Sequence, residues 1–215
     1  MKKCIGSGAI AALAVVGMAS SAFAGSGVLL VDSANGSAFS PRDRAQSDDA
    51  TSTTLVQGFT LAADSILDLA SIRGYSAGAD ITIAITDAMG VGASASNILF
   101  EQTFAIDADG FGSSIRQFNL GGLNLDAGSY FFVLMSDDPV GFEWARVSPG
   151  GLGVDNRGSA TYTVGSPYIS QNYTFFNGET DQVYVLDIEG GAVPTPGAAS
   201  LIALGGLTAA RRKRR

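Results

Sequence analysis

The sequence nearly lacks three residue types on which much enzyme and metal chemistry depends. It contains no histidine, its one cysteine is Cys4, and its lysines are Lys2, Lys3 and Lys213. Without histidine or a second thiol there is no Ser-His-Asp or Cys-His triad, no disulfide and no ordinary zinc or copper site. The lack of lysine inside the chain likewise excludes Schiff-base and Ser-Lys chemistry. No Gly-x-Gly-x-x-Gly or Walker-type loop supports nucleotide binding.

The N-terminus has the pattern of a secretory signal peptide. A positively charged start is followed by an apolar core over residues 5–18, and Ala22-Phe23-Ala24 forms a small-x-small cleavage site before Gly25. We therefore expect residues 1–24 to be removed on export. The residues that define the cut are Ala22, Ala24 and Gly25.

The C-terminus falls into three parts. Val193-Pro194-Thr195-Pro196 is a rigid element, because its prolines fix φ and remove two backbone donors. An apolar run over 197–210 follows, and the chain ends in Arg211-Arg212-Lys213-Arg214-Arg215. The run has 14 residues, or 18 when counted from Val193, whereas a membrane-spanning helix needs roughly 20. The length is therefore borderline and allows brief retention in a bilayer. The terminal cations would hold that end on the cytoplasmic side of a membrane.

This three-part order resembles the PEP-CTERM sorting signal of Gram-negative bacteria, which the membrane protease exosortase recognises and cuts. Thr195 stands where that family usually has glutamate, which makes this a Pro-Thr-Pro variant of the motif. The resemblance implies export by the Sec machinery, transient anchoring in the inner membrane, and cleavage near Pro194–Pro196 by an exosortase-like protease. The alternatives are an ordinary C-terminal membrane anchor and a disordered basic tail.

The remaining residues 25–192 are long enough for one domain with a real core. Seven of the 13 Lys and Arg residues lie in the two terminal segments, which leaves six arginines against 20 acids and changes the net charge from −7 to −14. Nucleic acid and anionic lipid would be repelled by such a surface. We therefore expect no nucleic-acid partner.

The pattern of apolar residues in this region predicts strands. Within Asp80–Asp87, three isoleucines alternate with Thr82, Ala84 and Thr86, the period of a strand packed on one face. Two short runs, 130–135 and 183–186, are rich in aromatic and β-branched residues and suit central strands. Further predicted strands are 28–31, 53–60, 66–75, 98–106, 114–120, 142–147, 160–164 and 173–176. About ten short antiparallel strands indicate an all-β protein, a β-sandwich of jelly-roll type.

Turn residues separate these segments. We predict turns at Gly121-Gly122, 126–128, 137–139 and Gly150-Gly151. The polar stretch 33–52 contains Pro41 and is expected to be a long exposed loop.

Part of the body also resembles the second half of many PEP-CTERM ectodomains. The matching segments are Asp126-Ala127-Gly128-Ser129-Tyr130, then Trp144, then Asp181-Gln182-Val183-Tyr184-Val185. This resemblance is loose and implies a sandwich but no activity.

Asp107-Ala108-Asp109-Gly110 is a weak candidate calcium site. Carboxylates two residues apart, followed by glycine, can begin a calcium loop, but the sequence after Gly110 lacks further ligands. A hairpin turn between the strands that end at Ile106 and start at Ser114 explains the same residues.

Aromatic residues offer a candidate glycan site. Phe142 and Trp144 should project from one face of a strand, and Tyr173 and Phe175 from one face of another. Exposed Trp144 and Tyr173 could stack on sugar rings, whereas aromatics at these spacings usually form the core. A glycosidase with two catalytic carboxylates remains open on composition alone.

These observations predict a non-enzymatic exported protein without a cofactor. After transit through the inner membrane it would reach the cell surface or extracellular space, with a structural or adhesive role in the envelope or biofilm and extracellular polysaccharide as a candidate partner. The alternative functions are a carbohydrate-binding β-sandwich module and, less favoured, a carboxylate-dependent glycosidase.

Overall fold

The computed structural model is all-β and confirms the predicted fold class. It describes residues 28–33, 40–47, 51–109, 114–136, 138–139, 141–147, 153–163, 166–175 and 183–193. These residues form thirteen strands and two short 3₁₀ helices, η1 (Ala95–Asn97) and η2 (Tyr168–Ser170). The strands are β1 (Val28–Asp32), β2 (Ser40–Ser47), β3 (Thr51–Leu61), β4 (Ser65–Ser76), β5 (Ile81–Thr86), β6 (Ile98–Phe104), β7 (Ser114–Leu125), β8 (Gly128–Ser136), β9 (Phe142–Val147), β10 (Val154–Thr163), β11 (Thr174–Phe175), β12 (Val183–Tyr184) and β13 (Leu186–Ala192).

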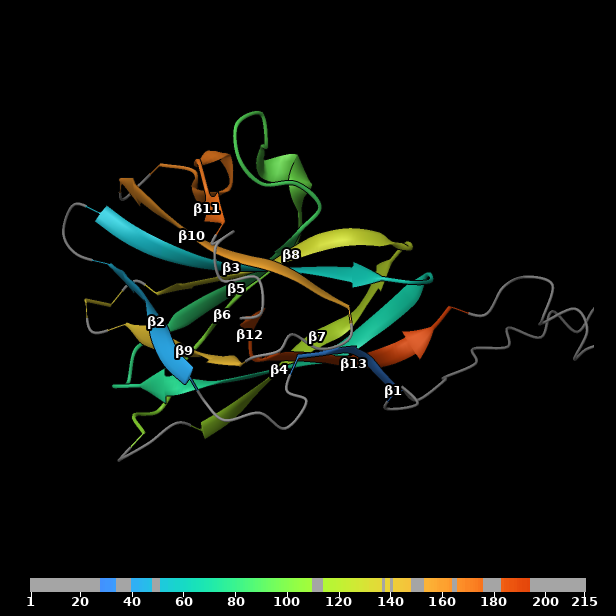
Figure 1. Cartoon of the computed structure of the whole chain (residues 1–215), viewed down its shortest axis with the longest axis horizontal. Coiled ribbons are helices and arrows are strands. Elements are labelled where there is room, and N and C mark those ends of the chain that lie inside the picture. The colour runs from blue at the N-terminus through green and yellow to red at the C-terminus, as the bar shows by residue number, and fades with distance from the viewer. Residues whose placement is uncertain are drawn as a thin grey trace, which may run out of the picture.

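The strands pair antiparallel in two sheets, which β2 joins into one continuous 13-stranded sheet, and the two pack face to face as a sandwich (Figure 1). The first sheet contains β1, β13, β4, β7, β9 and β12, and the second contains β6, β5, β8, β3, β10 and β11. Strand β2 belongs to both, because its first part pairs with β9 and its last two residues pair with β3. A strand that switches sheets in this way makes a corner of the sandwich.

The presence of β2 overturns the predicted polar loop over 33–52. Ala45 of this strand is fully buried, as is Ser33, and Ser52 already belongs to β3. The prediction was wrong because β2 has little apolar alternation of its own, so its extended conformation depends on pairing with β9 and β3. Every predicted strand, by contrast, overlaps an observed one.

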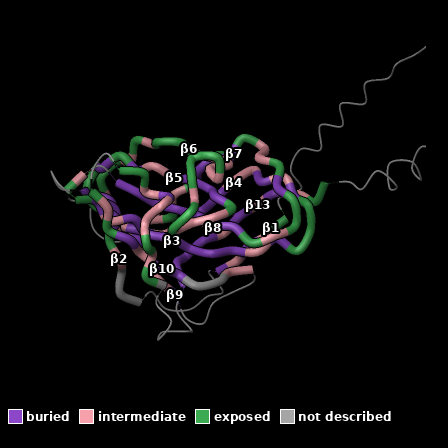
Figure 2. The backbone as a smooth tube through the Cα atoms, turned by 90° about the horizontal axis from the view of Figure 1, so that it is seen from above, coloured by how far each residue is buried: buried purple, intermediate pink, exposed green. Residues whose placement is uncertain are grey.

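The main core lies between the sheets. Ile81, Ile83 and Ile85 of β5 are fully buried in it, as the alternating pattern predicted. The opposite face of β5 is also covered, because Ala84 belongs to a second, smaller cluster against which Met89 packs. Figure 2 shows the buried residues concentrated along the strands inside the molecule.

Two predicted turns have different outcomes. Gly121 and Gly122 lie within β7, where positive φ values of 69° and 74° produce a bulge rather than a turn. Leu67 and Leu69 of β4 pair with Leu123 and Asn119, so the extra residues of β7 stand opposite one residue of β4. The predicted turn at 126–128 does connect β7 to β8. Asp137 and the predicted turn at Gly150-Gly151 lie outside the described residues.

Candidate functional site

The two ends of the described domain lie side by side. Strand β1 begins at Val28, which pairs with Gly190 of β13. Strand β13 ends at Ala192, and the backbone N–H of Val193 donates to the backbone oxygen of Asp64 at 2.9 Å. The next residue in the chain is Pro194 of the predicted sorting motif. The predicted site residues Ala22, Ala24, Gly25, Pro194, Thr195, Pro196, Arg211, Arg212, Lys213, Arg214 and Arg215 lie outside the described residues.

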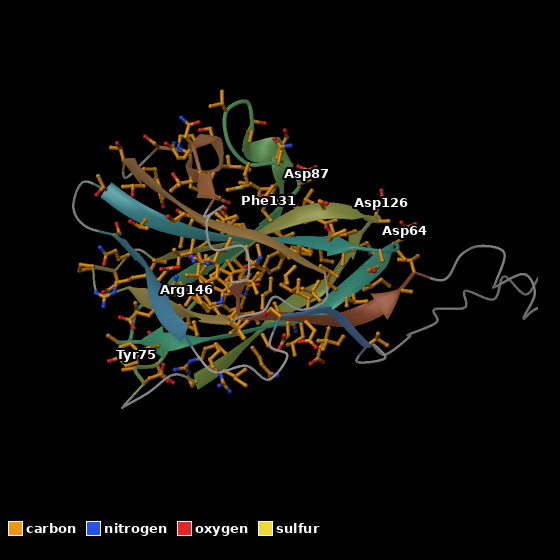
Figure 3. The ribbon with its side chains drawn as sticks, viewed as in Figure 1. Asp64, Tyr75, Asp87, Asp126, Phe131 and Arg146 are labelled. Carbon is orange, nitrogen blue, oxygen red and sulfur yellow. The ribbon has the colours of Figure 1, made fainter. Side chains whose placement is uncertain are left out.

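Two turns between the sheets complete this end of the domain. The carboxylate of Asp64, in the β3–β4 turn, accepts a hydrogen bond from the backbone N–H of Ala127, in the β7–β8 turn, at 2.9 Å. Figure 3 shows Asp64 and Asp126 at this end of the ribbon. We call the end formed by residues 28–29, 62–64, 126–127 and 192–193 the terminal pole.

The Asp126–Tyr130 segment has a structural role at the terminal pole. The hydroxyl of Tyr130 donates to the backbone oxygen of Asp126 at 2.8 Å, which fixes the turn that leads into β8. The Tyr130 ring lies 5.7 Å from the ring of Phe59 in the core, and burial raises the pKa of its hydroxyl. This arrangement is a tyrosine corner in the general sense, a tyrosine that bonds to the backbone a few residues upstream. It accounts physically for the sequence pattern Asp-Ala-Gly-Ser-Tyr.

Exposed apolar side chains gather at the terminal pole. Val28, Leu29 and Val193 are 51%, 39% and 36% exposed, and they lie at the ends of the neighbouring strands β1 and β13. The other exposed large apolar residues in the described part of the chain are Val91 and Ile115, away from the pole. Three of the five exposed large apolar residues in the described part of the chain therefore lie where the domain continues into the predicted signal.

The predicted hairpin between Ile106 and Ser114 is wrong. Strand β6 pairs with β5 and strand β7 pairs with β4, so the segment between them crosses from one sheet to the other. Within it, the Asp109 carboxylate accepts hydrogen bonds from the Ser114 hydroxyl and an Arg116 guanidinium nitrogen, both at 2.6 Å. It also accepts one from the backbone N–H of Ser76 at 3.0 Å. Asp109 thus joins the crossover to β4 and β7.

This use of Asp109 disfavours the calcium interpretation. The donors occupy both carboxylate oxygens, and Asp107 contributes its backbone oxygen to Arg116. In the described ranges no group of three or more His, Cys, Asp or Glu side chains is placed to hold a metal ion. Burial alone raises the pKa of Asp109, but the hydrogen bonds from Ser114, Ser76 and Arg116, with the charge of Arg116, outweigh it and lower the pKa below its ordinary 3.8.

We predict that Asp109→Asn reduces the acid sensitivity of folding. Because the folded-state pKa is lowered, the stabilisation by the carboxylate is fully present above the unfolded-state pKa and is lost as pH falls through the folded value. Urea unfolding from neutral pH to below about pH 4 should show a smaller loss of stability in the variant than in the wild type. Val91→Ala, which removes an 84% exposed side chain and no carboxylate, should retain the wild-type slope. Equal slopes of stability against pH in the wild type and in Asp109→Asn would contradict this role of the Asp109 carboxylate.

The predicted glycan pair is not formed. Trp144 is fully buried between the sheets, and its indole N–H donates to the backbone oxygen of Val185 at 2.8 Å. Tyr173 is partly buried in the cluster on the outer face of the second sheet, where its hydroxyl donates to the backbone oxygen of Tyr168. The two rings lie on opposite faces of that sheet and cannot stack on one sugar. Phe142 is also fully buried, so core packing is the correct interpretation of this strand.

A buried charged cluster at the β2 corner was not predicted. The Asp43 carboxylate accepts hydrogen bonds from an Arg157 guanidinium nitrogen at 2.9 Å and from the Tyr184 hydroxyl at 2.8 Å. The Nε atom of Arg146 forms an ion pair with the same carboxylate at 3.7 Å. The Arg157 side chain is only 2% exposed. Gln57 extends the cluster by accepting the backbone N–H of Tyr184 at 2.8 Å. Burial, the charge of Asp43 and its hydrogen bond raise the pKa of Tyr184.

This Asp43 cluster joins strands from both sheets. Asp43 lies on β2, Arg146 on β9, Arg157 on β10 and Tyr184 on β12. The Arg157 guanidinium also lies 5.7 Å from the centre of the Tyr184 ring, within the range of a cation–π contact. The contacts cross-link the corner where β2 passes between the sheets, and we assign the cluster a structural role.

Comparison with known proteins gives no family assignment. No protein-family model and no curated protein matches this chain. Among solved structures, a chain from "Structure of infectious bursal disease virus Gx strain" is similar at a TM-score of 0.28 and 10% identity. The match covers 87% of this chain and 49% of that chain, so this chain spans about half of that protein's length. In the described residues, no helix is long and apolar enough to cross a membrane.

Proposed function

We propose that this chain is an exported, non-enzymatic protein whose β-sandwich is sorted through its C-terminal segment. The Sec machinery carries it through the inner membrane, and the apolar run over 197–210 holds it there. An exosortase-like protease then cuts near Pro194–Pro196 and releases the domain to the cell surface or the extracellular space. There it has a structural or adhesive role in the envelope or biofilm matrix, with extracellular polysaccharide as its candidate partner.

The observation that best supports this proposal is the position of Val193. The last strand ends one residue earlier, and the residue after Val193 begins the Pro-Thr-Pro motif. The folded domain and the sorting motif are therefore contiguous in the chain, so a cut in the motif would release the domain without removing any of its strands. The net charge of −14 for residues 25–192, with 20 acids and six arginines, favours solubility after release.

The proposal predicts that the prolines of the motif are needed for release. We expect the double variant Pro194→Ala/Pro196→Ala to remain in the membrane fraction with its C-terminal tail, because helix-compatible residues replace the rigid element before the apolar run. Fractionation of the native host followed by detection of the tail measures this. Pro139→Ala, at an exposed turn proline, should be released normally. Release of the double variant at the wild-type level would contradict a role for the motif.

The glycan-binding alternative is not proposed in its predicted form. It required Trp144 and Tyr173 to be exposed together, whereas Trp144 is fully buried.

A further inference from the structure

The terminal pole carries a cluster of exposed large apolar residues. Val28, Leu29 and Val193 are three of the five exposed large apolar residues in the described part of the chain. The turns beside them add further exposed apolar residues, Ala62, Ala63 and Ala127. Pairing of Val28 with Gly190, and the hydrogen bonds of Asp64 to Val193 and Ala127, bring these residues together. The result is a cluster of exposed apolar residues at one end of the domain, with the exposed side chains of Asp64 and Asp126 beside it.

The connection between the terminal pole and the apolar run is short, so the pole lies close to any membrane that holds the run. Only Pro194, Thr195 and Pro196 separate Val193 from the start of the apolar run at Gly197. Four residue steps span at most about 14 Å even when fully extended. If the run lies in a bilayer, the terminal pole must therefore lie near its surface.

We propose that the terminal pole rests on the lipid surface while the protein is anchored, with Val28, Leu29 and Val193 in contact with the headgroup and acyl boundary. This inference rests on the proposed function, because it requires the tail to be in the membrane. Apolar side chains next to an inserted segment gain free energy by leaving water at that boundary. The domain then stands with the ends of β1 and β13 towards the bilayer, next to the segment that the protease must reach.

The charges at the pole specify the type of lipid surface. Asp64 and Asp126 are exposed there, and Glu189 lies on β13 nearby. All six arginines of residues 25–192 lie outside the segments that form the pole. Anionic headgroups would repel these carboxylates, so the pole should bind to zwitterionic lipid and dissociate as the anionic fraction rises. The same carboxylates would repel one another if two poles met, which favours a lipid surface over a second copy of the chain.

Single cysteine probes test this contact in the chain from Gly25 to Arg215, which has no native cysteine. An environment-sensitive fluorophore is attached at Ala62→Cys, in the terminal pole, or at Val91→Cys, which is 84% exposed in the β5–β6 loop. Each protein is reconstituted in phosphatidylcholine vesicles. We expect a several-fold rise and a blue shift of emission at position 62 and little change at position 91. Adding Val28→Ser/Leu29→Ser should remove most of the rise at position 62 while flotation with the vesicles persists.

The possible results separate this inference from the anchoring proposal. Flotation without a signal at position 62 would overturn the contact and leave anchoring intact. Failure to float would overturn both. A blue shift that depends on protein concentration and occurs without vesicles would instead indicate self-association through the pole, and would also overturn the contact.

Discussion

Replacing Trp144 with alanine is expected to destabilise the domain by about 3–5 kcal/mol, the range for removing a large aromatic side chain from a core. The indole is fully buried and is stacked on the Tyr184 ring, with the ring centres 4.4 Å apart. Its ring centre also lies 5.6 Å from that of Phe132 in the opposite sheet. Alanine would leave a cavity between the sheets and would also remove the N–H that donates to Val185. Urea unfolding followed by far-UV circular dichroism measures the change.

Two control variants show whether the loss comes from this packing. Trp144→Phe keeps a ring in the core and should lose less stability than Trp144→Ala. Val91→Ala removes a side chain that is 84% exposed and should change stability by less than about 0.5 kcal/mol. A Trp144→Ala variant as stable as Val91→Ala would contradict the placement of this ring between the sheets.

Replacing Asp43 with asparagine is expected to destabilise the domain by about 3 kcal/mol, the lower end of the range for removing one partner of a buried ion pair. The lower end applies because Asp43 is 26% exposed, whereas the Arg157 guanidinium that it neutralises is 2% exposed. The change removes the carboxylate charge that the Arg157 guanidinium contacts at 2.9 Å and weakens the acceptor of the Tyr184 hydroxyl. The same unfolding experiment measures it.

The matched control is the ion pair next to it on the protein surface. Arg44 lies 2.6 Å from Glu143, but the two side chains are 47% and 25% exposed. Arg44→Gln should therefore destabilise by less than about 1 kcal/mol. Equal effects of Asp43→Asn and Arg44→Gln would mean that the Asp43 cluster does not hold the corner together.

The sequence predicted those strands whose own residues carry the pattern of a strand. The alternation in β5 and the exact bounds of β9 are examples. Strand β2 was missed because its polar residues and Pro41 indicate a loop, and its conformation depends on partners in two sheets. The double glycine of β7 was assigned to a turn because the sequence does not show that β4 pairs on both sides of it. Local patterns thus predicted strand positions but not the pairing between them.

The same limit applies to the sites. Asp43 is 114 residues from Arg157 and 141 from Tyr184, so no local motif joins them. Asp109 was noticed for its spacing from Asp107, yet its partners include Ser76 from a distant strand. The role of Tyr130 is different, because its hydrogen bond to Asp126 lies within the segment that the sequence had singled out. The terminal pole required the pairing of β1 with β13, which the sequence did not predict.

The measurement that tests sorting most directly is the intact mass, with C-terminal peptide mapping, of the protein recovered from the envelope and medium of its own host. We predict a chain that begins at Gly25 and ends near Pro194–Pro196. A chain that begins at Gly25 but still ends in Arg215 would contradict cleavage by an exosortase-like protease and would indicate a permanent membrane anchor.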